Sequence, residues 1–181
     1  MGDIMEIIII GNENNFFDSL NKKSRAIILK YDEILVANYG GVYLLPGGKL
    51  EEFEDYNTAL FRELKEELGW NIMTPDIDPY LIVKHYQDNF PTREGTIKNR
   101  LVITQYYLFN VLDDFEVKNN KLSESEKKDN FKLEFIKLDM LEDVIKNNDS
   151  VNPRKKYFDI ELLEIVERVN FKKHKVLKKQ I

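Results

Sequence analysis

Cysteine is absent from all 181 residues, which excludes disulfide bonds, thiolate metal ligands and cysteine nucleophiles. Proline and glycine are sparse, with five and eight residues, and no tract of them marks a linker or a disordered segment. Long hydrophobic runs are also missing, because the apolar run at residues 7–10 is too short for a signal-peptide core or a membrane span. We therefore expect a soluble, cytoplasmic protein without a membrane partner.

A surplus of basic residues is lacking as well. The formal net charge is -5, whereas a general nucleic-acid binder normally has a basic surface, so the composition disfavours nucleic acid as a partner. It does not exclude a single anionic ligand held through a metal ion. Hydrophobic residues make up 43% of the chain and aromatic residues 12%, which is enough to bury a core at this length. We therefore predict one domain over residues 1–181.

Apolar residues recur alternately with the two-residue period of strands and the 3.6-residue period of helices. The predicted strands lie at residues 5–10, 25–30, 34–37, 42–45, 81–86, 102–111 and 131–138. The predicted helices lie at residues 56–68 and 140–146, with a C-terminal helix at about 153–177 that begins at Pro153. Strands on both sides of a central helix, followed by closing helices, indicate an α/β fold (an α+β sandwich) in which a mixed β-sheet is packed between helices.

The residues that carry chemistry are concentrated in the central predicted helix. Asp55 is a suitable N-cap and Gly69 a suitable C-terminal stop, so the two residues set the frame of the helix. In that frame Glu63, Glu66 and Glu67 are three and four residues apart and project from one face. Carboxylates this close repel one another unless a cation neutralises them, and Mg²⁺ bridges carboxylates to phosphates. Taken alone, the pattern is equally typical of a solvated, glutamate-rich helix face.

The glycine pair Gly47 and Gly48, which follows Pro46, favours a functional interpretation of the helix. Glycine reaches backbone conformations closed to other residues and, because it lacks a side chain, lets a phosphate approach the backbone. The pair precedes the helix by a short loop. Its carbonyl groups can therefore point at the same cation as the glutamates.

Together these residues resemble the sequence motif of the Nudix hydrolases, which is glycine, five residues, glutamate, seven residues, then Arg-Glu-aliphatic-any-Glu-Glu-any-Gly-aliphatic. The positions that match in register are Gly48, Glu54, Arg62, Glu63, Leu64, Glu66, Glu67 and Gly69. With each fixed letter at a frequency of about 0.07, a match at one starting point has a probability on the order of 10⁻⁸. Two positions depart from the pattern, since Trp70 replaces an aliphatic residue and Phe53 replaces a glycine that often precedes the glutamate.

The resemblance implies a Nudix fold and hydrolysis of a phosphoanhydride by water at a metal centre. It implies that Glu63, Glu66 and Glu67 hold Mg²⁺, with Mn²⁺ as the alternative metal. The carbonyl of Gly47 or Gly48 would complete the ligand set on the protein side.

The resemblance also implies supporting and catalytic roles. Arg62 and Glu54 would orient the metal ligands, and one glutamate would accept a proton from the attacking water. Glu63 is our first choice for this base. The alternative is a carboxylate in the polar loop segment that precedes the last predicted strand, where we favour Glu126 over Glu124, although an ordinary exposed acidic loop would show the same composition.

Substrate-binding residues are expected on strands near the cleft. Arg25, Tyr43 and Arg100 are candidates for contacting the base or the phosphates, and each could equally be an ordinary surface side chain. Tyr86 lies 16 residues past Trp70, a spacing found in family members that act on dinucleoside polyphosphates rather than on ADP-ribose, although Tyr86 could also be a packing residue. The expected substrate is a small nucleotide: a nucleoside triphosphate, a dinucleoside polyphosphate or a nucleotide sugar.

Two other function classes share the resemblance. A nucleotide-sensing domain that keeps the fold without turnover would normally have lost glutamates of the motif, and none is lost here. A prenyl-diphosphate isomerase would need a cysteine, which the chain lacks. Relatives often pair, so a homodimer is a candidate assembly. We therefore predict a metal-dependent pyrophosphohydrolase, with a non-catalytic nucleotide-sensing domain as the alternative.

Overall fold

The computed structural model describes residues 5–72, 76–112, 115–117 and 131–178, with side chains described up to residue 170. Eight strands in these ranges form one mixed sheet, whose main path runs β1-β6-β7-β2-β3-β4, with β5 paired to β2 and β8 paired to β3. The strands are β1 (Glu6–Ile10), β2 (Ser19–Lys30), β3 (Glu33–Tyr39), β4 (Val42–Leu44), β5 (Gly47–Lys49), β6 (Leu81–Pro91), β7 (Ile97–Asn110) and β8 (Lys132–Lys137). The pairs β1–β6 and β2–β7 are parallel, and the other pairs are antiparallel.

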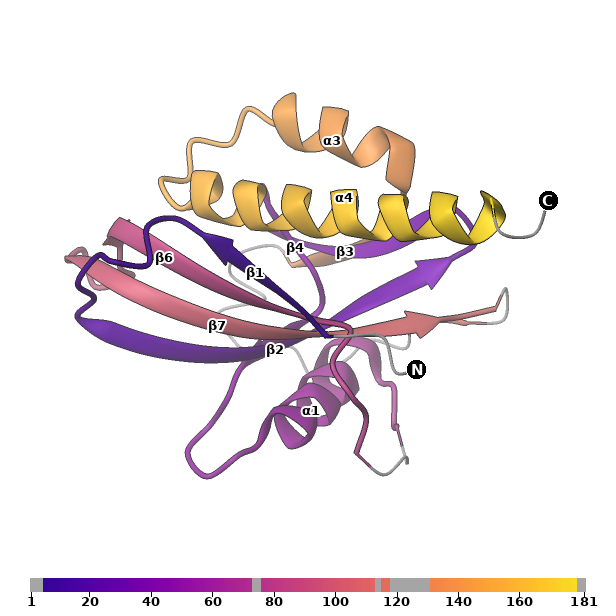
Figure 1. The fold of residues 1–181 in the computed structure, drawn as a ribbon, viewed down its shortest axis with the longest axis horizontal. Coiled ribbons are helices and arrows are strands. Elements are labelled where there is room, and N and C mark those ends of the chain that lie inside the picture. Colours follow the sequence, from indigo (N-terminus) through magenta and orange to yellow (C-terminus); the bar gives the residue numbers. More distant parts are fainter. Residues whose placement is uncertain (1–4, 73–75, 113–114, 118–130, 179–181) are drawn as a thin grey trace.

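Helices cover both faces of the sheet (Figure 1). Helix α1 (Tyr56–Leu68) packs on one face, and α3 (Leu138–Lys146) and α4 (Lys155–Lys178) pack on the other. The predicted mixed sheet between helices is therefore confirmed. None of the helices in the described ranges has the length and apolar composition that crossing a membrane requires.

Alternation along β2 divides the core into two layers. Ile27 and Leu29 point to the face covered by α3 and α4, whereas Ala26 and Ile28 point to the face covered by α1. All four side chains are buried, and each fully buried isoleucine or leucine contributes roughly 1.5–3 kcal/mol. Because the strand is buried on both sides, a shift of its register by one residue would exchange the two layers. The core thus fixes which residues of β2 face α1.

Both ends of α1 lie where the sequence predicts them. The side chain of Asp55 accepts a hydrogen bond from the backbone N–H of Thr58 at 2.7 Å, and Gly69 ends the helix in the left-handed conformation with φ 65°. Leu60, Leu64 and Leu68 form the buried stripe of the helix. The caps and the stripe together fix the rotation of α1, and with it the direction of its glutamates.

The structure differs from the sequence prediction at several element boundaries. Strand β6 ends five residues later than predicted, and β7 begins five residues earlier. Gly47 and Gly48 belong to the short strand β5 rather than to a loop, because the backbone of this segment pairs with β2. Strand β2 begins at Ser19, six residues before the predicted start, since its polar first half gains its partners from β7. The last helix begins at Lys155, after a turn at Pro153 and Arg154.

Candidate functional site

Glu67 is the most deeply buried carboxylate of α1, with 1% of its surface exposed. Its Oε2 accepts a hydrogen bond from the backbone N–H of Gly47 at 2.8 Å, and its Oε1 accepts one from the hydroxyl of Tyr39 at 3.1 Å. These bonds join α1 to β5 and β3. Two neutral donors are a small compensation for a buried negative charge.

Burial raises the pKa of Glu67 to about 8, and the neighbouring charge of Glu63 adds to this effect. Burial likewise raises the pKa of Glu63, against the opposing effect of Arg62. Two adjacent carboxyl groups with raised pKa values are a costly arrangement in a structural helix. Such pairs are instead typical of functional sites.

The glycine pair lies directly against these two glutamates. The N–H of Gly47 points at Glu67 and hence away from β2, and in an antiparallel strand the carbonyl of a residue points to the same side as its N–H. The carbonyl of Gly47 is therefore directed to the side of α1, whereas the backbone of Gly48, the next position, faces Ser24 of β2. A Cβ atom at Gly48 would lie 2.2 Å from Oε1 of Glu63, so only glycine permits this approach.

Arg62 forms ion pairs with three glutamates of the site. Its Nε and Nη2 donate to the two carboxylate oxygens of Glu54 at 2.8 and 3.0 Å, a bidentate pair. Its Nη1 donates to Oε1 of Glu63 at 2.9 Å and lies 3.5 Å from Oε2 of Glu66. Hydrogen bonding from Arg62 lowers the pKa of Glu54. Glu54 stays charged and fixes the guanidinium, which in turn fixes Glu63.

The site fits a divalent cation by the chemistry of its donors. In the described ranges, no three carboxylate or histidine groups converge closely enough to hold an ion as they stand, because Glu63 and Glu66 are turned to Arg62 and Glu67 to Gly47. The donors are nevertheless all oxygens, as Mg²⁺ requires. Burial and the charge of Glu63 raise the pKa of Glu67. A cation between the carboxylates would offset both effects, because its positive charge stabilises the ionised form of Glu67.

A small cavity of about 10 Å³ lies on the face of the sheet opposite α1, between strands β2, β4 and β7 and helix α4. Its polar lining is Lys23, Arg25, Tyr43, Tyr106 and Glu161. Arg25 is buried and donates from Nη1 to the carbonyl of Leu45, and its charge also reaches Glu63 and Glu67. Burial and the charge of Arg25 lower the pKa of Lys23 to about 7. The lining of this cavity therefore carries two basic side chains, Lys23 and Arg25.

Glu161 of α4 is the carboxylate that faces these cations. It accepts hydrogen bonds from the Tyr106 hydroxyl at 2.5 Å and from Nδ1 of His85 at 2.8 Å. Burial pushes the pKa of Glu161 up, but the bonds from His85 and Tyr106 and the charge of Lys23 outweigh it and lower the pKa to about 2. The carboxylate therefore links α4 to β6 and β7 through a buried hydrogen-bond network with His85 and Tyr106.

Glu161→Gln tests the energetic weight of this network. A folded-state pKa near 2, below the ordinary value of 4.5, gives stability that is present above about pH 4.5 and is lost as the pH falls through about 2. We expect the variant to be less stable than the native chain at pH 7 by on the order of 2–3 kcal/mol, with the difference shrinking toward pH 2. Urea unfolding at pH 7 and pH 3 measures it, with the exposed Glu142→Gln as control; equal losses at both pH values would contradict the account.

The remaining candidates from the sequence are placed differently. Arg100 lies on β7 on the cavity side, where its Nε donates to Oε1 of Gln87 at 2.6 Å. Tyr86 points to the opposite face of the sheet, where its ring contacts Phe17 at a centroid distance of 6.5 Å, so the structure does not bring it together with Arg25 and Tyr43. Glu126 and Glu124 lie outside the described residues.

The sequence analysis missed Lys23, Tyr106 and Glu161. Glu161 and His85 are separated by 76 positions, and no local pattern connects them. Lys23 stands in a polar stretch with Lys22, and its direction becomes visible only once the register of β2 is known. Trp70, by contrast, packs behind α1 as its position in the motif suggests, with its ring against Phe109 and Phe115 at centroid distances of 5.1 and 5.2 Å.

Comparison with known proteins gives one family. The family model described as NUDIX domain matches residues 21–158. The chain is 37% identical over 68 residues to an 8-oxo-dGTP diphosphatase of Proteus vulgaris, a match that covers 38% of this chain and 56% of that protein. The chain thus matches just over half the length of this curated relative.

Two solved structures are similar to this chain, and the first of them has the same fold. A bifunctional NMN adenylyltransferase/ADP ribose pyrophosphatase from Francisella tularensis superposes with a TM-score of 0.50 at 20% identity, over 80% of this chain and 40% of that chain. A MutT protein from Bacillus halodurans gives a TM-score of 0.45 at 23% identity, over 68% of this chain and 72% of that chain.

Proposed function

This chain belongs to the Nudix family, and from that premise we propose that it is a metal-dependent pyrophosphohydrolase that cleaves a diphosphate linkage in a nucleoside diphosphate derivative. The observation that carries the proposal is the buried Glu67, bonded to the N–H of Gly47, beside the partly buried Glu63, which Arg62 holds. Burial of a carboxyl group beside a second one opposes folding, and such pairs are typical of functional sites.

Glu63, Glu66, Glu67 and the carbonyl of Gly47 would hold Mg²⁺ or Mn²⁺. The direction of the Gly47 N–H favours its carbonyl over that of Gly48 as a ligand. When bound, the ion supplies charge neutralisation on the diphosphate oxygens and lowers the pKa of bound water. The glutamates' own part is to bring negative oxygen ligands to a position shielded from solvent.

Glu63 is our proposed proton acceptor for the attacking water. Its carboxylate lies against Gly48, where no side chain blocks a phosphate, and the bond from Arg62 at 2.9 Å fixes its direction. Glu126, outside the described residues, is the alternative base. In either case the oxygen of water forms the new bond to phosphorus, the bridging oxygen leaves with its electron pair, and the glutamate takes the proton.

The cavity lined by Lys23 and Arg25 suits the part of the substrate that lies beyond the cleaved linkage. Arg25 and Lys23 would hold phosphate oxygens, and Tyr43 at the same cavity would contact the base. Arg100 lies farther along the same side. In the present structure the cavity is about 10 Å³, so a nucleotide must part β4 from α4 to enter. Tyr86 would act on a substrate only if the substrate reached the opposite face.

A panel of nucleotides tests the proposal. We would measure release of phosphate, diphosphate or nucleoside monophosphate from nucleoside triphosphates, dinucleoside polyphosphates and nucleotide sugars with Mg²⁺, with Mn²⁺ and with EDTA. Since a relative carries the name 8-oxo-dGTP diphosphatase, 8-oxo-dGTP and dGTP belong in the panel. Turnover with a metal and none with EDTA is the expected result; tight nucleotide binding without turnover of any member would favour a nucleotide-sensing domain.

Arg62→Lys isolates the role of the guanidinium. Lysine keeps the positive charge but loses the bidentate bond to Glu54 together with the bond to Glu63. We expect a loss of about 10- to 100-fold in metal affinity or in kcat, with little change in the melting temperature. Metal titration of activity measures the effect, and Arg168→Lys on α4 is the matched control. Unchanged metal dependence would show that Arg62 does not position the glutamates.

A further inference from the structure

Strands β3 and β4 form a hairpin that contacts the carboxylates of α1 on one face and lines the cavity on the other. Alternation along β3 places Leu35 and Tyr39 on the side of α1, and the hydroxyl of Tyr39 donates to Oε1 of Glu67 at 3.1 Å. Tyr43 of β4 pairs with Asn38, the neighbour of Tyr39, and lines the cavity beside α4. The hairpin therefore connects Glu67 to the other side of the sheet.

The turn of the hairpin is held by the loop between α3 and α4, residues 147–154. The side-chain amide of Asn148 donates to the carbonyl of Gly41. The hydroxyl of Ser150 donates to the carbonyl of Gly40 at 3.4 Å. A Cβ atom at Gly41 would lie 2.7 Å from Cβ and Oγ of Ser150, and its φ of 85° favours glycine. The turn and the loop are thus in close contact.

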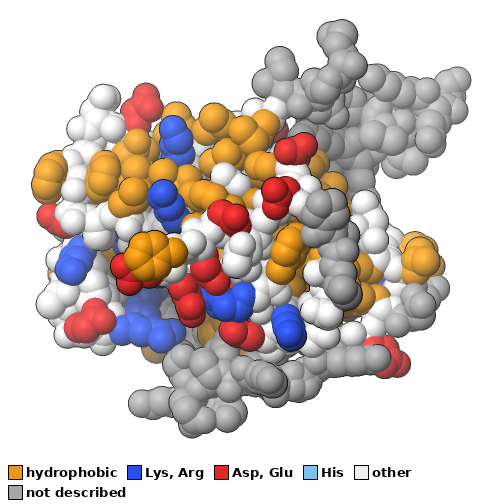
Figure 2. All heavy atoms as spheres, turned by 90° about the horizontal axis from the view of Figure 1, so that it is seen from below, with side chains coloured by type: hydrophobic (Ala, Val, Ile, Leu, Met, Phe, Trp, Pro, Cys, Tyr) orange, Lys and Arg blue, Asp and Glu red, His pale blue; other side chains and the backbone are white. Residues whose placement is uncertain are grey.

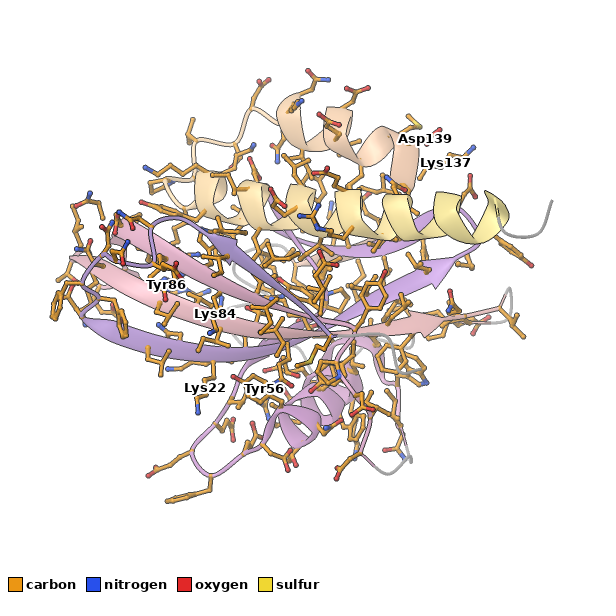
Figure 3. All side chains as sticks on the ribbon, viewed as in Figure 1. Lys22, Tyr56, Lys84, Tyr86, Lys137 and Asp139 are labelled. Atoms are coloured by element: carbon orange, nitrogen blue, oxygen red, sulfur yellow. The ribbon has the colours of Figure 1, made fainter. Side chains whose placement is uncertain are left out.

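The loop and Glu67 lie on opposite sides of the sheet. Figure 1 shows the loop beside α3 and α4, on the side away from α1, and the labelled residues Tyr56 of α1 and Asp139 of α3 mark these two sides in Figure 3. The hairpin bridges this separation, because Gly40 directly follows Tyr39 in the chain. A displacement of the turn from the loop therefore moves the hydroxyl that contacts Glu67.

Tyr39 acts on a carboxylate of the proposed metal site. Figure 2, seen from the side of α1, shows acidic side chains close together near the middle of this face, with lysine or arginine side chains among them. Burial raises the pKa of Glu67, and the hydrogen bond from Tyr39 is one of the interactions that lower it, so the bond favours the charged form that binds a cation. Because a carboxylate oxygen has two acceptor positions, Oε1 can accept from Tyr39 and still bind a cation.

We propose that Tyr39 is a positioning residue for Glu67, and that the loop between α3 and α4 holds Tyr39 in place through Asn148 and the turn of the hairpin. The inference rests on the proposed metal-dependent function. When the turn is released from the loop, the end of β3 moves and the Tyr39 hydroxyl no longer fixes the rotation of the Glu67 carboxylate. The metal affinity of the site therefore depends on a hydrogen bond on the far side of the sheet.

Asn148→Asp tests the contact between loop and turn. Aspartate keeps the acceptor for the N–H of Ser150, but it replaces the amide donor with a carboxylate oxygen that repels the carbonyl of Gly41. Tyr39→Phe removes only the hydroxyl. We expect each variant to bind Mn²⁺ about 10-fold more weakly than the native chain, with little change in melting temperature. Electron paramagnetic resonance of free Mn²⁺, in the absence of nucleotide, measures the dissociation constant.

The double variant Tyr39→Phe with Asn148→Asp shows whether the two residues act through one path. Once the hydroxyl is gone, the loop has no contact through which to act on Glu67. We therefore expect the Mn²⁺ dissociation constant of the double variant to match that of Tyr39→Phe within about two-fold. A combined loss of about 100-fold, the product of two independent effects, would overturn the inference.

Asn147→Asp, exposed in the same loop, is the matched control for the added charge and should bind Mn²⁺ as the native chain does. Equal weakening by Asn147→Asp and Asn148→Asp would show a general effect of charge and would overturn the inference. Native Mn²⁺ affinity in Asn148→Asp or in Tyr39→Phe would also overturn it, while the proposed hydrolysis would stand. A native chain that binds no Mn²⁺ would overturn the proposed metal-dependent function and the inference with it.

Discussion

Glu67→Gln is expected to lower kcat/KM by about 10³-fold, since glutamine has nearly the same shape but cannot carry the charge that a metal ligand needs. The amide oxygen would keep the bond from the Gly47 N–H, and the amide NH2 would donate to the hydroxyl oxygen of Tyr39 in place of the bond that Glu67 accepts from it. Nucleotide turnover at saturating Mg²⁺ measures the loss. Glu142→Gln, on the exposed side of α3, is the control and should have native activity.

The same variant separates loss of activity from loss of fold. Because the pKa of Glu67 is raised to about 8, the metal-free native chain loses stability as the pH rises from about 4.5 through 8, whereas glutamine does not titrate. Glu67→Gln should therefore be at least as stable as the metal-free native chain at pH 8. A variant that unfolds at this pH would show that the charge of Glu67 supports the fold, which would contradict our account of the pair.

Gly47→Ala is expected to disrupt the fold around β5. A Cβ atom at this position would lie 2.3 Å from the carbonyl oxygen of Ser24 and 2.8 Å from Cα of Arg25, and its φ of 121° suits only glycine. Both clashes are with backbone, so no side chain can move away. We expect a loss of more than about 3 kcal/mol in the free energy of unfolding, measured by urea denaturation.

Gly48→Ala is the matched comparison. The nearest atoms to its Cβ belong to the carboxylate of Glu63, at 2.2 to 2.9 Å, and the end of this side chain can swing aside. Stability should therefore change by less than about 1 kcal/mol, while activity falls because Glu63 is displaced. Equal destabilisation by the two substitutions would show that β5 is not held against β2 as the structure describes.

Local signals explain what the sequence could predict. The frame of α1 follows from a cap at Asp55, a stop at Gly69 and leucines at helical spacing, and the structure places the helix ends at the predicted residues. Because three glutamates lie within this frame, their common face was predictable too. The two-layer packing follows from strand and helix periods in the same way.

Long-range pairing explains what could not be predicted. Gly47 and Gly48 look like a turn in sequence, and their role as a strand depends on β2, more than 20 positions earlier. The direction of Tyr86 depends on the phase of β6 against β7, which spacing past the motif does not contain. Lys23 and Glu161 meet only after α4 has packed on the sheet. These contacts join elements that no local pattern relates.

The central claim is that the glutamates of α1 promote attack of water on a phosphoanhydride. Its most direct test is a reaction in ¹⁸O-labelled water with Mg²⁺ and the best nucleotide of the panel, with mass spectrometry of the products. The account predicts one ¹⁸O atom in a phosphorus-containing product of the native chain, no product with EDTA, and labelled product formed about 10³-fold more slowly with Glu67→Gln. Tight nucleotide binding without labelled product, or label that persists in Glu67→Gln at the native rate, would contradict it.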